Sequence, residues 1–333
     1  MPEPWPNPVF ENALAYHRTA ALVAAVKLDL FSAIGAGATT ADAIAAKTDA
    51  SARGVRILCD FLTVIGLLQK QDMRYSLTAG SARFLDRSSP LALGHCVDFL
   101  AAPELITQLL HDPASYVRAG GSDALTLLDP DHPSWVRFAR AMAPFAAPGA
   151  KRVGAHVAAL PTPPRTVLDV AAGHGLYGIE VARAIPQAVV TAVDWAPVLA
   201  IAQENATAAG VTDRYRAIVG NAFEVEWGSG FDLVLLPNIL HYFDRDACVT
   251  LLQRASGSLA SAGRIWAVEF VPNEDRVAPP LQATFAFFAL ATSPGGDAYT
   301  LTDLDEIARA AGLRGATGRP LVPTAQTLVT FET

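Results

Sequence analysis

The segment Arg165–Gly178 most constrains the fold, because it reads as a buried strand, a glycine-rich turn and the start of a helix. Residues 166–170 are mostly apolar and β-branched and follow a proline-rich stretch, which is typical of a central parallel strand covered on both faces. Gly173, Gly175 and Gly178 come next, where a backbone without Cβ atoms can turn sharply and approach a ligand. The helix that follows would point free N–H groups toward the strand end. The segment therefore predicts a cofactor site.

The spacing Gly173-x-Gly175-x-x-Gly178 also matches the dinucleotide fingerprint, so a nicotinamide or flavin oxidoreductase is an alternative. Asp169, just before the glycines, would repel a pyrophosphate but could accept a hydrogen bond from an ammonium group. Asp194 ends the next apolar strand, where its carboxylate could accept both hydroxyls of a ribose. A ligand with an amino-acid end, a ribose and no phosphate satisfies both acids. This pattern favours S-adenosylmethionine as cofactor and S-adenosylhomocysteine as its product.

Beyond the prolines near residue 161, strands and helices alternate, which predicts an α/β fold with a doubly wound parallel sheet. The expected strands lie near 166–170, 189–194, 215–219, 231–236, 264–270 and 326–331. The expected helices lie near 176–185, 197–209, 245–260 and 301–311, with Gly210, Gly263 and Gly312 as stops for three of them. Ligands of such sheets bind beyond the carboxyl ends of the strands, so the residues that follow each strand are the site candidates.

The N-terminal part, residues 1–100, predicts a mainly helical, winged-helix-like domain. Its expected elements are an extended proline-rich arm at 1–8, helices over 10–26, 41–47, 51–68 and 79–85, and a hairpin over 67–77 that turns at Gln71-Asp72. Many winged helices bind DNA, but the third helix offers only Arg53 and Arg56 and no basic stripe. A dimerisation or lid domain is therefore the better interpretation.

The rest of the chain divides into two further parts. Residues 101–160 read as a helical linker that could line a substrate chamber, and residues 161–333 as the S-adenosylmethionine-binding domain. A group of prolines places the boundary between them near 155–164.

Composition restricts the partners. The net charge is −7 and no run of five basic residues occurs, which disfavours nucleic acid and anionic membranes and favours a small-molecule substrate. No apolar run reaches 18 residues and the N-terminal sequence lacks the basic region of a signal peptide, so we expect a cytoplasmic protein. Cys59, Cys96 and Cys248 are scattered without a CxxC pair or metal-like spacing, so neither a disulfide framework nor a metal site is expected.

Two groups that follow later strands could carry chemistry. Asn221 could hydrogen-bond an adenine edge while Phe223 packs on the ring, although an Asn-containing turn is an alternative. His241 falls about one turn beyond the fourth strand, and Glu269 ends the next strand, where its carboxylate could orient the imidazole. A purely structural histidine is the other interpretation. The position beside Glu269 favours a general base.

The full set of candidates follows from these positions. The cofactor candidates are Asp169, Gly173, Gly175, Asp194, Trp195, Asn221, Ala222, Phe223 and Asn238. The acceptor candidates are apolar or aromatic and suit a flat ring: Phe138, Met142, Phe285, Phe288 and Tyr299.

Several motifs together resemble one enzyme family. They include R-I-L-C-D-F-L-T-V-I-G-L-L, L-D-V-A-A-G-H-G, the acid of A-V-D, G-N-A-F, I-L-H-Y-F-D-R-D-A-C and G-R-I-W-A-V-E. The chain resembles the S-adenosylmethionine-dependent small-molecule O-methyltransferases with an N-terminal dimerisation domain, typified by the plant caffeate and hydroxyindole types and many bacterial natural-product enzymes. The resemblance covers most of the chain.

The resemblance carries its own implications for the site and the assembly. It implies that Gly173 lines the cofactor, Asp194 holds the ribose, Asn221 and Ala222 flank the adenine, Met142 touches substrate or cofactor, and His241 is the general base. It also implies an obligate homodimer in which the N-terminal region of one subunit closes the pocket of the other.

The chain departs from the family pattern near the expected base. Tyr242 stands where the family often has Asp, and Ala298 stands where plant-type enzymes often place a second supporting Glu. Two further alternatives stay open beside O-methylation, and these changes support the first of them. One is a C-methyltransferase that uses the same pocket on an enolizable or electron-rich carbon. The other is a catalytically silent protein that binds the cofactor.

Overall fold

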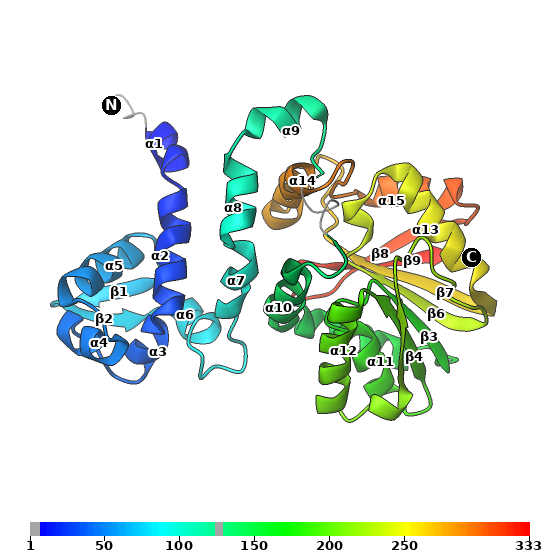
Figure 1. Cartoon of the computed structure of the whole chain (residues 1–333), viewed down its shortest axis with the longest axis horizontal. Coiled ribbons are helices and arrows are strands. Elements are labelled where there is room, and N and C mark those ends of the chain that lie inside the picture. The colour runs from blue at the N-terminus through cyan, green and yellow to red at the C-terminus, as the bar shows by residue number, and fades with distance from the viewer. Residues whose placement is uncertain (1–6, 124–128) are drawn as a thin grey trace. The chain divides into compact units, whose positions relative to one another are not determined.

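A computed structural model describes residues 7–123 and 129–333 and separates the chain into two compact units, Met1–Pro103 and Glu104–Thr333 (Figure 1). Residues 1–6 of the expected extended arm lie outside the described residues. The last two residues of that expected arm, Asn7 and Pro8, belong to a helix. By packing, residues 104–160 belong to the second unit. The functional division of the chain into three parts stays a prediction.

The first unit is mainly helical with one two-stranded hairpin. Its elements are α1 (Asn7–Ala13), α2 (Tyr16–Lys27), α3 (Leu30–Gly35), α4 (Ala41–Thr48), α5 (Ala52–Val64), β1 (Leu68–Gln71), β2 (Arg74–Leu77), α6 (Ala79–Phe84) and α7 (Val97–Leu100). The Thr40 and Ser51 hydroxyls accept hydrogen bonds from Ala43 N–H and Gly54 N–H, so both side chains cap helices.

Three local expectations in this unit need correction. The expected helix over 10–26 is broken into α1 and α2, and the Asn12 amide donates to the Pro8 carbonyl, a local bond that competes with regular helix. The helix expected to reach residue 68 ends at Val64, and Gly66 then turns the chain with φ +80°. The hairpin turns one residue later than expected, at Asp72 and Met73, which both have positive φ as a tight two-residue turn requires.

The second unit is built around a seven-stranded sheet of order β5-β4-β3-β6-β7-β9-β8. Its helices are α8 (Pro103–Leu110), α9 (Pro113–Ala119), α10 (Pro133–Ala158), α11 (Leu176–Ala184), α12 (Ala196–Ala208), α13 (Arg245–Gly257), α14 (Pro280–Thr292) and α15 (Leu301–Ala310). Its strands are β3 (Thr166–Val170), β4 (Val189–Asp194), β5 (Tyr215–Val219), β6 (Phe231–Pro237), β7 (Leu259–Glu269), β8 (Gly315–Pro320) and β9 (Thr327–Glu332). Strands β3 to β7 are parallel and β9 runs antiparallel between β7 and β8. The doubly wound α/β fold is confirmed.

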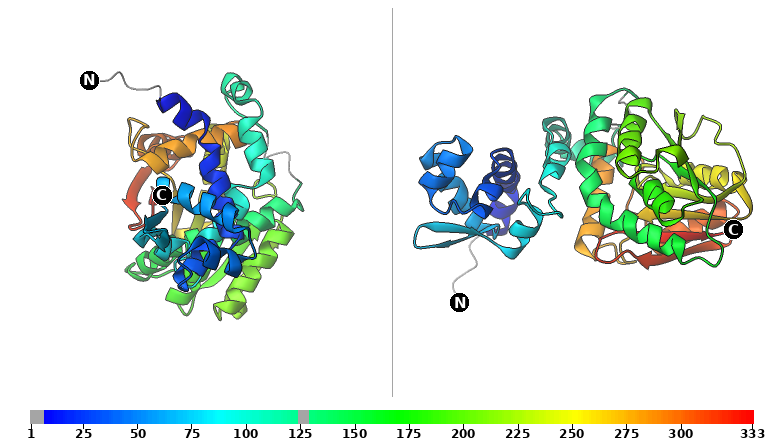
Figure 2. Two further views of the ribbon diagram at one scale, coloured as in Figure 1. Left: turned by 90° about the vertical axis from the view of Figure 1, so that its left-hand side faces the viewer. Right: turned by 90° about the horizontal axis from the view of Figure 1, so that it is seen from below.

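Alternate residues of the central strands face opposite helix layers. Leu233 and Leu235 of β6 pack in one core with residues of α10, α11 and α12, whereas Val234 and Leu236 pack in the other with residues of α13 and α15. Figure 1 shows α11 and α12 on one side of the sheet and α13 and α15 on the other, and Figure 2 gives two further views. Burial on both faces explains why these strands read as continuous apolar runs.

The sequence missed two elements of this unit and misplaced a strand start. Helix α14 and strand β8 were not expected, and β7 begins at Leu259 rather than near 264. Gly263 therefore lies inside β7 and does not stop a helix; a Cβ there would come within 2.6 Å of the Phe231 carbonyl. Close approach of two strands at an irregular pairing explains this glycine.

No helix in the described part of the chain is long and apolar enough to cross a membrane. Among the same residues, no group of three or more His, Cys, Asp or Glu side chains is placed to hold a metal ion. Cys59, Cys96 and Cys248 are buried thiols.

Candidate active site

The second unit contains a cavity of about 340 Å³ at the carboxyl ends of β3, β4, β5 and β6. It is lined by Trp135, Phe138, Ala171, Ala172, Gly173, His174, Tyr177, Val193, Asp194, Trp195, Val198, Gly220, Asn221, Ala222, Phe223, Pro237, Asn238, Ile239, Tyr242 and Phe243. The lining is mostly apolar and includes no Lys or Arg. Its location is where ligands of doubly wound sheets bind.

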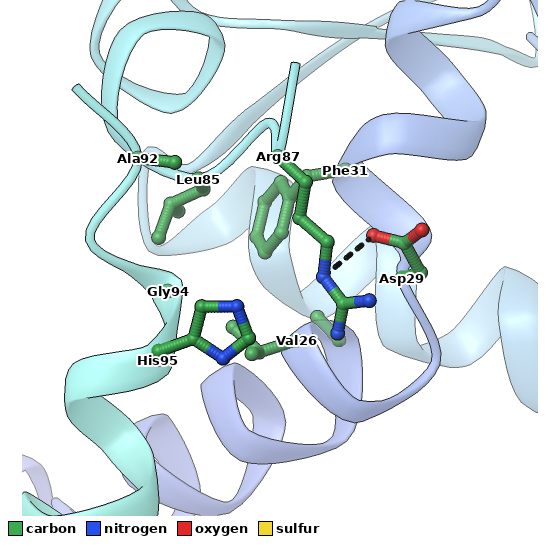
Figure 3. A pocket seen from close by; sticks show the side chains of 9 residues that line it. Val26, Asp29, Phe31, Leu85, Arg87, Ala92, Gly94 and His95 are labelled. Atoms are coloured by element: carbon green, nitrogen blue, oxygen red, sulfur yellow. Dashed lines mark ion pairs between the residues drawn. The ribbon is translucent and has the colours of Figure 1, made fainter. Parts of the chain in front are cut away.

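The first unit holds a smaller cavity of about 130 Å³ (Figure 3). Val26, Phe31 and Leu85 line it, and an ion pair between Arg87 Nε and Asp29 Oδ1 at 3.2 Å lies at the same place. It is far smaller than a nucleoside cofactor needs. The candidate active site is therefore the cavity at the strand ends.

The glycine loop between β3 and α11 carries several N–H groups that a phosphate could use. Side chains of the protein already accept from three of them: Asp194 Oδ2 from Gly173 N–H at 2.8 Å, His174 Nδ1 from Leu176 N–H at 3.2 Å, and Asp169 Oδ2 from Gly178 N–H at 3.0 Å. The expectation of free donors at the helix start is therefore wrong for the Leu176 and Gly178 N–H groups. A pyrophosphate would have to displace these acceptors, so the loop does not suit a dinucleotide.

Packing explains why two of the loop positions are glycine. A Cβ at Gly175, where φ is +74°, would lie 2.5 Å from the Tyr215 hydroxyl and 2.9 Å from the Ala202 Cβ. A Cβ at Gly178 would lie 2.7 Å from both Asp169 Oδ2 and Val190 Cγ1. The fingerprint spacing therefore reflects close packing of α11 against the sheet.

Asp194 is the acid that faces the cavity. Its Oδ2 accepts from Gly173 N–H and its Oδ1 accepts from Trp195 N–H at 2.7 Å, which fixes the carboxylate at the end of β4. Burial raises the pKa of Asp194 to about 6, against the opposing effect of these two N–H donors. Each oxygen keeps a lone pair for a ligand hydroxyl.

Asp169 lies beneath the loop and not in the cavity. Its side chain is fully buried, and burial raises the pKa of Asp169 well above its usual value. Its Oδ1 has no hydrogen-bond partner among the described residues, while its Oδ2 anchors Gly178 N–H. The expectation that Asp169 accepts directly from a ligand is not supported by this position, because the carboxyl group holds the start of α11.

His174 is a cavity residue that the sequence analysis did not single out. Its ring is 6% exposed, and burial lowers the pKa of His174 to about 4. The Asn205 amide donates to its carbonyl at 2.8 Å and fixes the loop from α12. The G-H-G sequence, with a histidine between two turn glycines, was the available signal.

The residues after β5 and β6 shape the far wall. Asn221 Oδ1 accepts from Phe223 N–H at 3.0 Å, and Asn221 Nδ2 donates to the Glu224 carboxylate. These bonds form an Asn-containing turn, which was the alternative to adenine binding in the sequence analysis. Phe223 meets Phe243 edge to face at 4.9 Å between ring centres. The Asn221 side chain therefore forms the turn that places Phe223 against the cavity.

Asn238 belongs to a buried polar network. The Gln326 amide donates to Asn238 Oδ1 at 2.6 Å, and the Tyr177 hydroxyl donates to Gln326 Oε1 at 2.9 Å. Asn238 has a positive φ of +56°, which is unusual for a residue other than glycine. The network stabilises this conformation through Tyr177 of α11 and Gln326, which directly precedes β9. Sequence reasoning could not find Tyr177 or Gln326, because they lie 149 residues apart.

His241 and Glu269 form a buried pair. His241 Nδ1 lies 2.6 Å from Glu269 Oε2, and Glu269 Oε1 accepts from Leu240 N–H at 2.9 Å. Both residues are 4% exposed. The ring of Phe285 from α14 meets the imidazole edge to face at 4.8 Å. The expected pairing of these two residues is present, and aromatic rings cover the histidine.

The structure separates the predicted site residues into two groups. The cavity brings together Phe138, Gly173, Asp194, Trp195, Asn221, Ala222, Phe223 and Asn238. The residues that do not line it are Asp169, Gly175, Met142, His241, Glu269, Phe285, Phe288 and Tyr299. Tyr299 is buried in the core and its hydroxyl donates to the Phe243 carbonyl at 2.6 Å, so it supports the loop after β6.

Residues 104–314 match the O-methyltransferase domain, and residues 10–87 match the O-methyltransferase dimerisation domain. The chain belongs to the O-methyltransferase family. The N-terminal unit of this methyltransferase thus carries the family's dimerisation domain, and the cavity lies in its catalytic domain.

Individual proteins agree with this assignment. The methyltransferase is 28% identical over 312 residues to the 3-hydroxy-5-methyl-1-naphthoate 3-O-methyltransferase of Streptomyces sahachiroi, with 92% of this chain and 89% of the relative covered. It is 42% identical to a proposed O-methyltransferase from Nostoc punctiforme, with a TM-score of 0.92 and 99% of both chains covered. Human N-acetylserotonin methyltransferase, solved in complex with S-adenosylmethionine, shares the fold at 19% identity, with a TM-score of 0.82 and coverage of 100% of this chain and 99% of that one.

Proposed function

We propose that this methyltransferase uses S-adenosylmethionine to methylate a hydroxyl of a small aromatic or polyketide-like metabolite, with His241 as general base. The observation that carries the proposal is the combination, at one edge of one sheet, of a cavity of about 340 Å³ and a buried His–Glu pair. The naphthoate acted on by the Streptomyces relative and the cofactor bound by the human relative support the two ligand classes.

The cavity suits a nucleoside without phosphates. Asp194 would accept a hydrogen bond from each of the two ribose hydroxyls, because each carboxylate oxygen is bound by one backbone N–H and can accept a further hydrogen bond. Phe223 and Ala222 offer an apolar surface for the adenine ring. No Lys or Arg lines the cavity, so nothing there would neutralise a pyrophosphate. The residues present therefore fit S-adenosylmethionine better than a dinucleotide.

The His241–Glu269 pair would remove the acceptor proton. With Nδ1–H donating to Glu269, the Nε2 of His241 holds the lone pair that can accept a proton from a hydroxyl. The carboxylate then stabilises the imidazolium that results. S-adenosylmethionine, when bound, supplies a methyl group that is already activated on a sulfonium. What remains for the chain is to align the acceptor oxygen with that methyl group and to hold its proton.

An aromatic cluster favours a flat acceptor. Phe285 stacks on Phe270 at 4.6 Å between ring centres, Phe288 lies 5.5 Å from Phe285, and Phe145 also stacks with Phe270 at 6.2 Å. A planar ring inserted beside Phe285 would bring its hydroxyl to His241 and would bury apolar surface on both faces. Because His241 is 4% exposed, this insertion requires one of the aromatic rings around it to move.

We also propose a homodimer formed through the first unit. Beyond the match to the dimerisation domain, α1 and α2 expose large apolar side chains, among them Val9 at 66% and Tyr16 at 53%. Exposed apolar side chains grouped on neighbouring helices are typical of a surface that a partner covers. Sedimentation of the full chain tests this directly, and a monomer at micromolar concentration would contradict it.

The function is tested by calorimetry followed by product analysis. Purified protein should bind S-adenosylmethionine and S-adenosylhomocysteine but not NAD, and should transfer labelled methyl groups to phenolic oxygen in a panel of hydroxynaphthoates and related phenols. A label found on carbon would assign the C-methyltransferase instead. Cofactor binding with no transfer to any phenol or quinone would assign a silent binding protein. No binding of either nucleoside to folded protein would exclude the whole proposal.

A further inference from the structure

His174 presents one hydrogen-bond donor to the cavity, and the geometry of the glycine loop fixes which ring atom it is. Leu176 N–H donates to His174 Nδ1 at 3.2 Å, so Nδ1 must carry a lone pair and the hydrogen of the neutral ring is on Nε2. His174 is 6% exposed and lines the cavity, and no hydrogen bond joins its Nε2 to the described residues. An N–H donor that can be reached from the cavity and is not bound to the protein can donate to a ligand.

Few other hydrogen-bond donors of the glycine loop and the cavity are available to an anionic group of a ligand. The N–H groups of Gly173, Leu176 and Gly178 are already bound to side chains, and the cavity has no Lys or Arg. The Nε1–H of Trp135 donates to the Asp129 carbonyl at 3.1 Å and is also engaged. His174 is thus the side-chain donor that the glycine loop offers to the amino-acid end of the cofactor.

We propose that His174 is a cofactor-positioning residue whose Nε2–H donates to the carboxylate of the methionine moiety of S-adenosylmethionine. This inference rests on the function proposed above. A neutral donor suits the site because a cation near the sulfonium would repel it, whereas an N–H group binds the carboxylate without adding charge. The fixed ring would hold one end of the cofactor while Asp194 holds its ribose.

The experiment separates the donor from the helix cap, because His174 provides both. His174→Ser keeps a side-chain oxygen that can accept from Leu176 N–H but removes the Nε2 donor, and His174→Gln keeps an amide donor that can reach the same place. His174→Phe keeps the ring volume without any donor. Affinity is measured by calorimetry for S-adenosylhomocysteine and for 5′-methylthioadenosine, which has the same adenine, ribose and thioether but no amino-acid group.

The Ser and Phe variants should bind S-adenosylhomocysteine about tenfold to hundredfold more weakly, because a hydrogen bond to a charged group is lost. Their affinity for 5′-methylthioadenosine should stay within about twofold of that of the original protein. His174→Gln should recover most of the difference. Equal losses for both nucleosides, or no loss for either, would overturn the role of His174 and leave the proposed function intact. If the unsubstituted protein binds neither nucleoside, the proposed function itself fails. If the Ser variant does not fold, the Phe and Gln variants give the same comparison.

Discussion

The Nδ1 of His241 lies 2.6 Å from Oε2 of Glu269. His241 belongs to the turn that joins β6 to α13, and Glu269 is the last residue of β7. The other oxygen of the same carboxylate accepts from Leu240 N–H, so Glu269 fixes both the imidazole and the backbone that carries it. Because β6 and β7 are adjacent parallel strands, their carboxyl ends bring these residues together although they lie 28 positions apart in the chain.

Replacing His241 by Ala should lower kcat by about 10²- to 10⁴-fold, the usual loss when a positioned general base is removed. Affinity for S-adenosylhomocysteine should stay within about twofold, since His241 does not line the cavity. Steady-state kinetics and calorimetry on the same preparation measure the two effects. Turnover that changed less than threefold would contradict the assignment of the base.

Glu269→Gln should have a smaller effect on turnover and a clear effect on stability. A glutamine offers one acceptor oxygen where the carboxylate has two, so either the His241 Nδ1–H or the Leu240 N–H loses its partner. The free energy of unfolding should fall by about 1–3 kcal/mol, the cost of one unsatisfied buried polar group. In the double variant with His241→Ala the losses in kcat should not multiply, because the two residues act as one unit.

The affinity for S-adenosylhomocysteine should depend on pH through Asp194. Burial raises the pKa of this carboxyl to about 6 in the free protein, and ribose hydroxyls bind the ionised form. Below pH 6 the proton competes with the ligand, so the affinity should fall by up to about tenfold per pH unit, and it should be constant from pH 7 to 8.

The matched control for this pH effect is Asp194→Asn. This variant should bind more weakly at pH 7 and should show a nearly flat profile between pH 5 and 8, because the group that titrates is gone. A profile in the Asn variant as steep as that of the original protein would assign the pH dependence to another group.

Gly175→Ala should lower the free energy of unfolding of the second unit by more than the cost of placing alanine at a positive φ. Its Cβ would lie 2.5 Å from the Tyr215 hydroxyl, whereas a Cβ at Gly210, with a similar φ of +71°, would have no neighbour within 4 Å. We expect a loss of about 1 kcal/mol for Gly210→Ala and about 2–4 kcal/mol for Gly175→Ala in denaturant unfolding.

A second substitution tests whether that contact is the cause. The Tyr215 hydroxyl is buried without a hydrogen-bond partner among the described residues, so Tyr215→Phe should cost little by itself. Combined with Gly175→Ala it should recover about 1 kcal/mol or more, because the atom nearest to the new Cβ is removed. Strictly additive losses would show that backbone strain dominates.

Much of the fold could be predicted from the sequence, because its strands are buried on both faces and follow clear breaks. The strands at 166–170, 189–194, 215–219 and 231–236 are present with nearly those bounds. Strand β8, Gly315–Pro320, was missed because its burial pattern is largely exposed and its sequence contains two glycines and a proline. Helix α14 was missed because it is apolar almost all round and shows no helical period.

The sequence by itself determined the strand ends that carry Asp194, Asn221, His241 and Glu269, since a parallel sheet places successive carboxyl ends at one edge. Only the tertiary structure decided what the glycine loop can bind. The sequence shows three glycines before a helix, but the acceptors that occupy its N–H groups come from β3, β4 and the loop itself. Hydrogen-bond partners distant in the chain leave no periodic signal, so which donors stay free for a ligand is settled only when the strands pack.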